Sequence, residues 1–293
     1  MRTLALTMAE LRSDSTQECL SGIRAAAVMK RDIQIVIPEL IRLLDREPFV
    51  LRLFASDALS KLGRSSVPFL IQSLRASAST RVKEGCIITL SKLGPRATQA
   101  IPELTRCLRK KSFPLRVPVA FALGSIKSTR KELKDALSHV LTEKNITLQI
   151  AAAAALLMSD RRNIDGILVI VAALRSKYPH RQRLAAQAIG KIQHPSRPII
   201  DSLKALLNNS DLKCRIASAV SLMRHGMHAT RAGKVVIGGL NAQILEVRQD
   251  ACISFNFLPI KLKREMLHVA FKSRYQDVRD WAVFAQSQAA IDV

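Results

Sequence analysis

The sequence predicts an all-α protein, a right-handed α-solenoid of about eight to nine helix pairs. Three observations carry this prediction. A two-part pattern recurs about every 33 residues along the 293-residue chain, and a fixed period of that size is the mark of a repeat array. Apolar residues within each part recur at helical spacing. Hydrophobic residues make up 48% of the chain but aromatic residues only 4%, which favours closely packed helices over β-structure.

The first part of each repeat is an apolar run that leads to a terminal Leu or Phe, as in residues 37–45, 67–75 and 101–109. Pro stands one residue into these runs, at Pro38, Pro68 and Pro102. A proline ring fits the first turn of a helix but not its interior. We therefore expect these three helices to begin just before their prolines.

The second part is small and apolar, as in residues 52–63, 116–126 and 183–192. Its residues follow a helical stripe, because 55, 58, 59 and 62 are spaced i, i+3, i+4 and i+7. Gly63 and Gly94 follow two such stripes and are expected to cap the helix ends. The segment 148–158 is apolar all round, which favours a helix buried within the array.

One residue near the middle of each second part marks the successive repeats, and the last copy is degenerate. The markers are Ile23, Leu59, Leu90, Leu123, Leu156, Ile189, Val220, Phe255 and Gln286. Neighbouring markers are 31 to 36 residues apart, the length of one helix pair. We expect a single array over residues 1–293, with degenerate capping repeats near 1–30 and 259–293.

The run IPEL followed by VLRLFASDALSKLG is similar to the HEAT-repeat family, in the short variant found in phycobilin lyases. The resemblance covers about residues 18–290. The family includes scaffolds, lyases, hydroxylases and DNA glycosylases, so the resemblance implies a fold and not an activity.

In that family an Asp after the first helix tends to pair with an Arg that begins the second. Asp45 and Arg52 match this pattern, but four of the eight equivalent positions are basic in this chain. The cations that begin the later second helices are therefore expected mostly to lack internal partners. They are Lys83, Arg116, Lys213, Arg248 and Arg279.

The chain is strongly basic, with 46 Lys and Arg against 23 Asp and Glu, a formal net charge of +23. Such an excess attracts polyanions. Many of the cations fall in the turns that join first to second helices, which in a solenoid emerge along one edge, and Phe113, Tyr178 and Tyr275 lie among them. We predict an anion- or partner-binding edge that consists of Arg75, Arg81, Arg109, Lys110, Lys111, Arg116, Arg175, Lys177, Arg181, Arg183, Lys213, Arg215, Lys272 and Arg274.

The competing interpretation of these turns is structural. Runs of charge on helical proteins are usually solvated surface, and such turns would keep an alanine-rich array in solution. The recurrence of the excess over several repeats is what favours binding.

No motif for catalysis, a cofactor or a metal is found. The sequence has no GxSxG, P-loop or GxGxxG, and no His-Glu dipeptide of the kind that ligates iron in HEAT-repeat hydroxylases. His225 and His228 have HxxH spacing but no third ligand nearby. We expect no catalytic residue, no cofactor and no metal.

Five scattered cysteines without a CxxC pair exclude a disulfide framework or zinc site and favour a cytoplasmic setting. The longest apolar runs, 150–158 and 167–174, are far shorter than the roughly 20 residues of a membrane span. We therefore expect no membrane association.

These observations favour a non-enzymatic scaffold that presents a basic surface to an acidic protein partner. The alternative is a nucleic-acid-binding protein that uses the turn edge. Among enzymes, a HEAT-like DNA glycosylase would depend on Trp281, with Asp277 and Asp280 beside it. A phycobilin-lyase-like protein is a remote alternative, because only the repeats support it.

Overall fold

The computed structural model describes residues 3–127 and 131–289. The described residues form eighteen α-helices and no β-strand, and within the two units eight pairs of successive helices pack against each other, from α1 with α2 to α17 with α18. The prediction of an all-α array of helix pairs is confirmed. The chain divides into two compact units, Met1–Glu143 and Lys144–Val293. The single array over 1–293 stays a prediction, and its outermost residues, 1–2 and 290–293, lie outside the described part.

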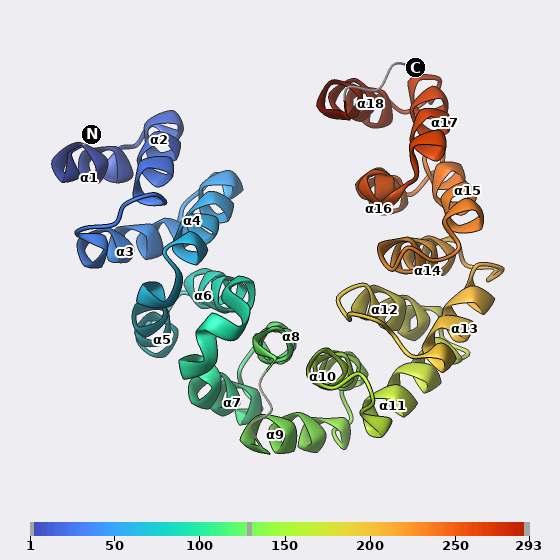
Figure 1. Cartoon of the computed structure of the whole chain (residues 1–293), viewed down its shortest axis with the longest axis horizontal. Coiled ribbons are helices and arrows are strands. Elements are labelled where there is room, and N and C mark those ends of the chain that lie inside the picture. Colours follow the sequence, from blue (N-terminus) through green and yellow to red (C-terminus); the bar gives the residue numbers. More distant parts are fainter. Residues whose placement is uncertain (1–2, 128–130, 290–293) are drawn as a thin grey trace. The chain divides into compact units, whose positions relative to one another are not determined.

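The first unit is two layers of helices (Figure 1). Odd-numbered helices contact one another along one layer, as α1 contacts α3 and α3 contacts α5, and even-numbered helices follow along the other, from α2 through α4 and α6 to α8. The helices are α1 (Leu4–Arg12), α2 (Thr16–Ala26), α3 (Ile33–Arg42), α4 (Phe49–Lys61), α5 (Val67–Ala76), α6 (Thr80–Leu93), α7 (Ile101–Arg109), α8 (Arg116–Ile126) and α9 (Lys131–Leu141).

The second unit has the same two layers (Figure 1). Its even-numbered helices form one continuous row, in which each contacts the next from α10 to α18, while α11, α13, α15 and α17 form the other layer. The helices are α10 (Ile146–Ser159), α11 (Ile164–Leu174), α12 (Pro179–Ile189), α13 (Arg197–Leu206), α14 (Leu212–Arg224), α15 (Ala229–Gly239), α16 (Leu245–Ile253), α17 (Ile260–Phe271) and α18 (Gln276–Ala289).

The core of each unit lies between its two layers, where the repeat markers are found. Seven of the nine markers are at most 5% exposed. The exceptions are Val220 and Gln286, which are only partly buried. Helix α10, the apolar segment of the sequence, is buried almost throughout, from Ile150 to Leu157, so the prediction of a buried helix is confirmed.

Pro68 and Pro102 lie in the first turns of α5 and α7, as predicted. Pro38 does not, because α3 begins at Ile33 and contains the proline in its interior. The bond that Pro38 cannot donate would have gone to the carbonyl of Gln34. Gln34 is exposed, so water can satisfy that carbonyl and the helix tolerates the ring.

Both predicted glycine caps are confirmed. Gly63 follows Leu62, the C-cap residue of α4, with a φ of 69°, and Gly94 is the C-cap of α6 with a φ of 56°. A positive φ is strained for residues with a Cβ. The two glycines therefore reverse the chain at the edge opposite the basic turns.

Candidate functional site

The turns that join first to second helices hold the predicted binding residues, and these residues fall into three groups. The first group is exposed, and its side chains make no hydrogen bond or ion pair with any residue that the structure describes. It consists of Arg109, Lys110, Lys111, Arg175 and Lys272. Three of these are consecutive: Arg109 ends α7, and Lys110 and Lys111 follow it.

A second group surrounds the two tyrosines of the turns. Lys177 and Arg181 lie over the Tyr178 ring, at 5.3 and 4.7 Å from its centroid. The Tyr178 ring is itself 48% exposed. Arg274 donates to the hydroxyl of Tyr275 at 2.9 Å. Arg181 keeps its hydrogen-bonding capacity, because a ring contact uses the guanidinium face and not its N–H groups.

The third group is engaged within the fold. Five of its cations pair with glutamates: Arg75 with Glu103, Arg81 with Glu47, Arg116 with Glu143, and both Arg183 and Lys213 with Glu246. Arg215 donates to the carbonyls of Asn209 and Ser210. These side chains have fewer donors left for a partner than those of the first group.

The expectation that the cations beginning second helices mostly lack partners is wrong for three of the five. Arg116 pairs with Glu143, Lys213 with Glu246, and Arg248 with Asp277. Each acid lies about one repeat further along the chain, in the next basic turn or at the start of its second helix. The family pattern predicts an acid within the same turn and therefore does not predict these pairs. The three pairs connect neighbouring repeats, and we call them the ladder.

The remaining positions of the family pattern also differ from expectation. Arg52 pairs with Glu47 at 3.4 Å, while Asp45 accepts a hydrogen bond from Ser79 at 2.7 Å, so the two do not pair with each other. Arg279 donates to the carbonyl of Ser273 at 2.6 Å. The matched Asp45 thus also reaches into the following repeat.

Hydrogen bonds from arginines lower the pKa of two acids in these pairs, Glu143 and Glu103. Arg116 is 9% exposed and also donates to the carbonyl of Leu108 at 2.6 Å. Its hydrogen bonds to Glu143 hold the pKa of that carboxyl below the usual value. Burial alone would raise the pKa of Glu103, but hydrogen bonds from Arg106 and Arg75 outweigh it and lower that pKa. These pairs are structural.

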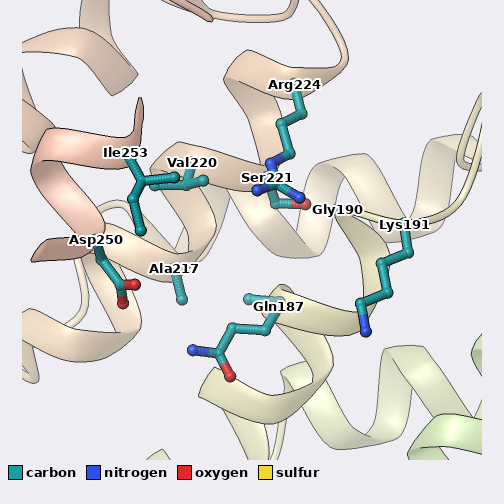
Figure 2. Close-up of a pocket in the computed structure, with 10 residues that line it drawn as sticks. Gln187, Gly190, Lys191, Ala217, Val220, Ser221, Arg224, Asp250 and Ile253 are labelled. Carbon is teal, nitrogen blue, oxygen red and sulfur yellow. The ribbon is translucent and has the colours of Figure 1, made fainter. Parts of the chain in front are cut away.

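A different site lies on the even-numbered layer of the second unit. A cleft of about 320 Å³ is lined by residues of α12, α14 and α16 and of the turn after α12. Figure 2 shows Arg224, Lys191, Gln187 and Asp250 around its opening. Its walls are Ala186, Gly190, Ala217, Val220, Ser221 and Ile253. Pockets of this size hold small molecules or single side chains of a partner.

Arg224 is the best-placed cation of this cleft. Its side chain crosses Gly190, where an added Cβ would stand 3.4 Å from both Cδ and Nη1 of the arginine. Its guanidinium lies over the ring of Phe257 at 5.0 Å. The aromatic contact holds the guanidinium plane and leaves its N–H groups for another acceptor.

Ser221 has no partner for its hydroxyl. The residue is 2% exposed, and its Oγ, buried at the cleft, forms no hydrogen bond with the described residues. A buried hydroxyl without a partner is costly. Such a group is therefore a candidate contact for a ligand.

Asp250 lies across the cleft from Arg224 (Figure 2). Burial, followed by the charge of Glu246, raises the pKa of the Asp250 carboxyl. Arg183, Arg224 and Lys213 are close enough to oppose that shift. The lining itself holds two cations, Lys191 and Arg224, and one carboxylate, Asp250.

No sequence pattern predicts this cleft. Arg224, Ser221 and Asp250 lie outside the basic turns and belong to no cluster of charge in the sequence. One signal was available, because Lys191 and Arg224 are 33 positions apart and follow the markers of two successive repeats. That spacing places both at the same end of neighbouring helices.

The residues considered for metal or base chemistry lie elsewhere. His225 and His228 do not share a helical face, because α14 ends at Arg224 and α15 begins at Ala229. The Nε2 of His225 instead contacts the carbonyl of Ile189 at 3.2 Å. Trp281 packs edge-on against Phe255, with ring centroids 5.4 Å apart. Among the described residues, no three His, Cys, Asp or Glu side chains are grouped to hold a metal.

Comparisons with known proteins concern the fold. No family model and no curated protein match the sequence. A chain of the complex of CpcE and CpcF of phycocyanin lyase from Nostoc sp. PCC7120 is 20% identical, with a TM-score of 0.49 over 86% of this chain and 95% of that chain. The protein YibA of Escherichia coli is 17% identical, with a TM-score of 0.43 over 94% and 98% of the two chains.

Human deoxyhypusine hydroxylase is 12% identical, with a TM-score of 0.37 over 86% of this chain and 94% of that chain. These neighbours are HEAT-like repeat proteins, and the likeness extends to the fold alone. In the part of the chain that the structure describes, no helix has the length and apolar character needed to cross a membrane.

Proposed function

We propose that this HEAT-like protein is a non-enzymatic scaffold that binds an acidic protein partner through its basic turns. The observation that carries the proposal is the run Arg109, Lys110 and Lys111, three consecutive exposed cations that pair with none of the described residues. Arg75 and Arg81, at the preceding turn, pair with glutamates. The side-chain N–H groups of the run therefore stay available to a partner.

An acidic protein suits such a surface because exposed charge of one sign steers a partner of the opposite sign and fixes its register. Arg175, Lys177 and Arg181 offer a similar surface on the second unit, where Tyr178 adds an exposed aromatic ring. Arginine and tyrosine are the residue types most enriched where protein interfaces gain their affinity.

The test is a pull-down from cell extract with the full-length chain, with and without nuclease. The variant Arg109→Ala/Lys110→Ala/Lys111→Ala removes three charges from the proposed surface. The matched control Lys61→Ala/Arg64→Ala/Arg96→Ala removes three exposed charges from the opposite ends of the helices. We expect one protein to be captured after nuclease treatment, lost with the first variant and retained with the control.

Two outcomes would contradict the proposal. Capture that disappears with nuclease would point to a nucleic acid, and equal capture by both variants would remove the turn from the interface. A thermal melt of each variant separates loss of binding from loss of folding.

The second candidate is a nucleic acid bound along the same turns. The specific support is Tyr178, exposed between Lys177 and Arg181, because aromatic rings among cations stack on unpaired bases. In this case binding to duplex or single-stranded DNA should weaken with salt, with a slope of about 0.9 or about 0.7 per neutralised phosphate respectively. The alanine variant at 109–111 should flatten that slope.

A further inference from the structure

The cleft between α12, α14 and α16 combines three features that point to a ligand. Arg224 is held by Phe257 and Gly190 with its N–H groups available, Ser221 has an orphaned hydroxyl, and Val220 and Ile253 offer apolar surface. Ile253 is 57% exposed. The basic turns share none of these residues.

We propose that this cleft binds an acidic side chain of a peptide segment, with an aliphatic side chain of the same segment packed beside it. The carboxylate would accept hydrogen bonds from the guanidinium of Arg224 and the hydroxyl of Ser221. The aliphatic neighbour would cover Val220 and Ile253.

The charges around the cleft indicate that its ligand is negatively charged. Lys191 and Arg224 line the cleft with one carboxylate, Asp250, while Arg183 and Lys213 lie close enough to act on Asp250 but pair with Glu246, so the cleft favours an anion. Glu246 is already held by Lys213 at 2.6 Å, which leaves the end of the cleft near Arg224 as the more positive one. An arginine in this setting prefers a carboxylate, which it binds with two parallel hydrogen bonds.

Asp250 sets the direction of the segment. Its carboxyl stands opposite Arg224 and repels a second acid at that end of the cleft (Figure 2). The wall beside it includes Ile253 and is apolar. A segment in which acidic and aliphatic residues alternate fits this arrangement better than a run of acids alone.

The hydroxyl of Ser221 makes the proposal unusually testable. Because the group has no partner in the fold, Ser221→Ala removes no internal hydrogen bond. The variant should be at least as stable as the parent chain, since a buried unsatisfied group is removed. Any loss of binding then reports on the ligand contact.

The experiment is fluorescence anisotropy with the full-length chain and labelled probes: a short peptide of alternating Glu and Leu, an all-Glu peptide of equal length, and a single-stranded DNA oligonucleotide. We expect the Glu-Leu peptide to bind more tightly than the all-Glu peptide. Arg224→Gln should weaken Glu-Leu binding about tenfold or more, and Ser221→Ala about three- to tenfold.

The charge-matched control is Lys234→Gln, which removes one exposed cation from the other layer of the same unit. It should leave the affinity for the Glu-Leu peptide within about twofold, because a distant exposed charge is largely screened. Thermal melts of all three variants confirm that each is folded.

Two results with the parent chain would overturn the inference: no measurable binding of the Glu-Leu peptide, or equal affinity for the all-Glu peptide. Two results with the Arg224 and Ser221 variants would also overturn it: unchanged binding of the Glu-Leu peptide, or a loss of affinity for the DNA probe alone. The inference rests on the proposed function only for the acidic nature of the partner. If the cleft variants bind normally while the 109–111 variant loses its partner, the cleft assignment fails and the proposed function stands.

Discussion

Arg248 gives the sharpest test of the ladder between repeats. The residue is 8% exposed, and its guanidinium donates to the Asp277 carboxylate and to the carbonyls of Ala242 and Gln243, each at 3.0 Å. It also lies over the ring of Tyr275 at 3.9 Å. We predict that Arg248→Met, which keeps an apolar chain of similar length but removes all four contacts, strongly destabilises the second unit.

The magnitude follows from the contacts. Each hydrogen bond from the guanidinium to a backbone carbonyl stabilises the fold by about 1 kcal/mol. The carboxylate bond adds about 1 kcal/mol, a low value because the Asp277 side chain is 41% exposed and can be rehydrated. The ring contact adds about 0.5–1 kcal/mol. After the methionine recovers some packing, we expect a net loss of about 3 kcal/mol.

The assay is urea denaturation followed by tryptophan fluorescence. The chain has one tryptophan, Trp281, and it belongs to the same unit as Arg248, so the signal reports on that unit alone. Lys272→Met is the control, because this exposed lysine pairs with no described residue, and it should change stability by less than about 0.5 kcal/mol. A loss below about 1 kcal/mol in Arg248→Met, or an equal loss in the control, would refute the structural role of the ladder.

Three further predictions follow from the buried ionisable groups. The pKa of Glu103 is lowered, so its ion pairs stabilise the folded chain above the unfolded pKa of about 4.3, and this stabilisation is lost as pH falls through the folded pKa. Glu103→Gln should therefore lower the free energy of unfolding by about 2 kcal/mol at neutral pH. It should also make the acid unfolding of the first unit, followed by circular dichroism, less steep. Burial raises the pKa of Asp250, so its charged form is unfavourable in the folded chain at neutral pH. Asp250→Asn should therefore raise the Tm by about 1–2 °C and tighten Glu-Leu peptide binding. A lower Tm would contradict this. Burial raises the pKa of Cys86 to about 12 and that of Cys107 to about 11. A thiol reagent at neutral pH should therefore modify both cysteines only when the chain unfolds. Rapid labelling of the native chain would show instead that the first unit opens readily.

The helix pairs could be predicted because their information is local. The markers and the glycine caps each depend on residues within one turn of a helix, and the structure confirms them. The prediction that α3 begins just before Pro38 was wrong. A proline ends a helix only where the carbonyl that loses its hydrogen bond has no other donor. Exposed Gln34 does not need that hydrogen bond, and no local pattern shows that exposure in advance.

The ladder and the cleft could not be predicted in the same way. Arg116 finds its acid at Glu143, which became visible only when neighbouring repeats were placed side by side. The orphaned hydroxyl of Ser221 is a property of packing and leaves no trace in composition. Lys191 follows α12, but most of the residues that share the cleft with it come from two other helices, α14 and α16.

The ladder also determines where this protein can be shortened or extended. Because Arg248 depends on Asp277, and Lys213 on Glu246, the unit of addition is a helix pair together with the first residues of the next second helix. A chain cut between α16 and α17 would keep every helix of its last pair and yet leave a buried guanidinium without its carboxylate. Gene duplication or engineered trimming that respects only helix boundaries would therefore create a cationic end. An array cut after the first turn of α18 would keep α17 and Asp277, and with them the pair of Arg248.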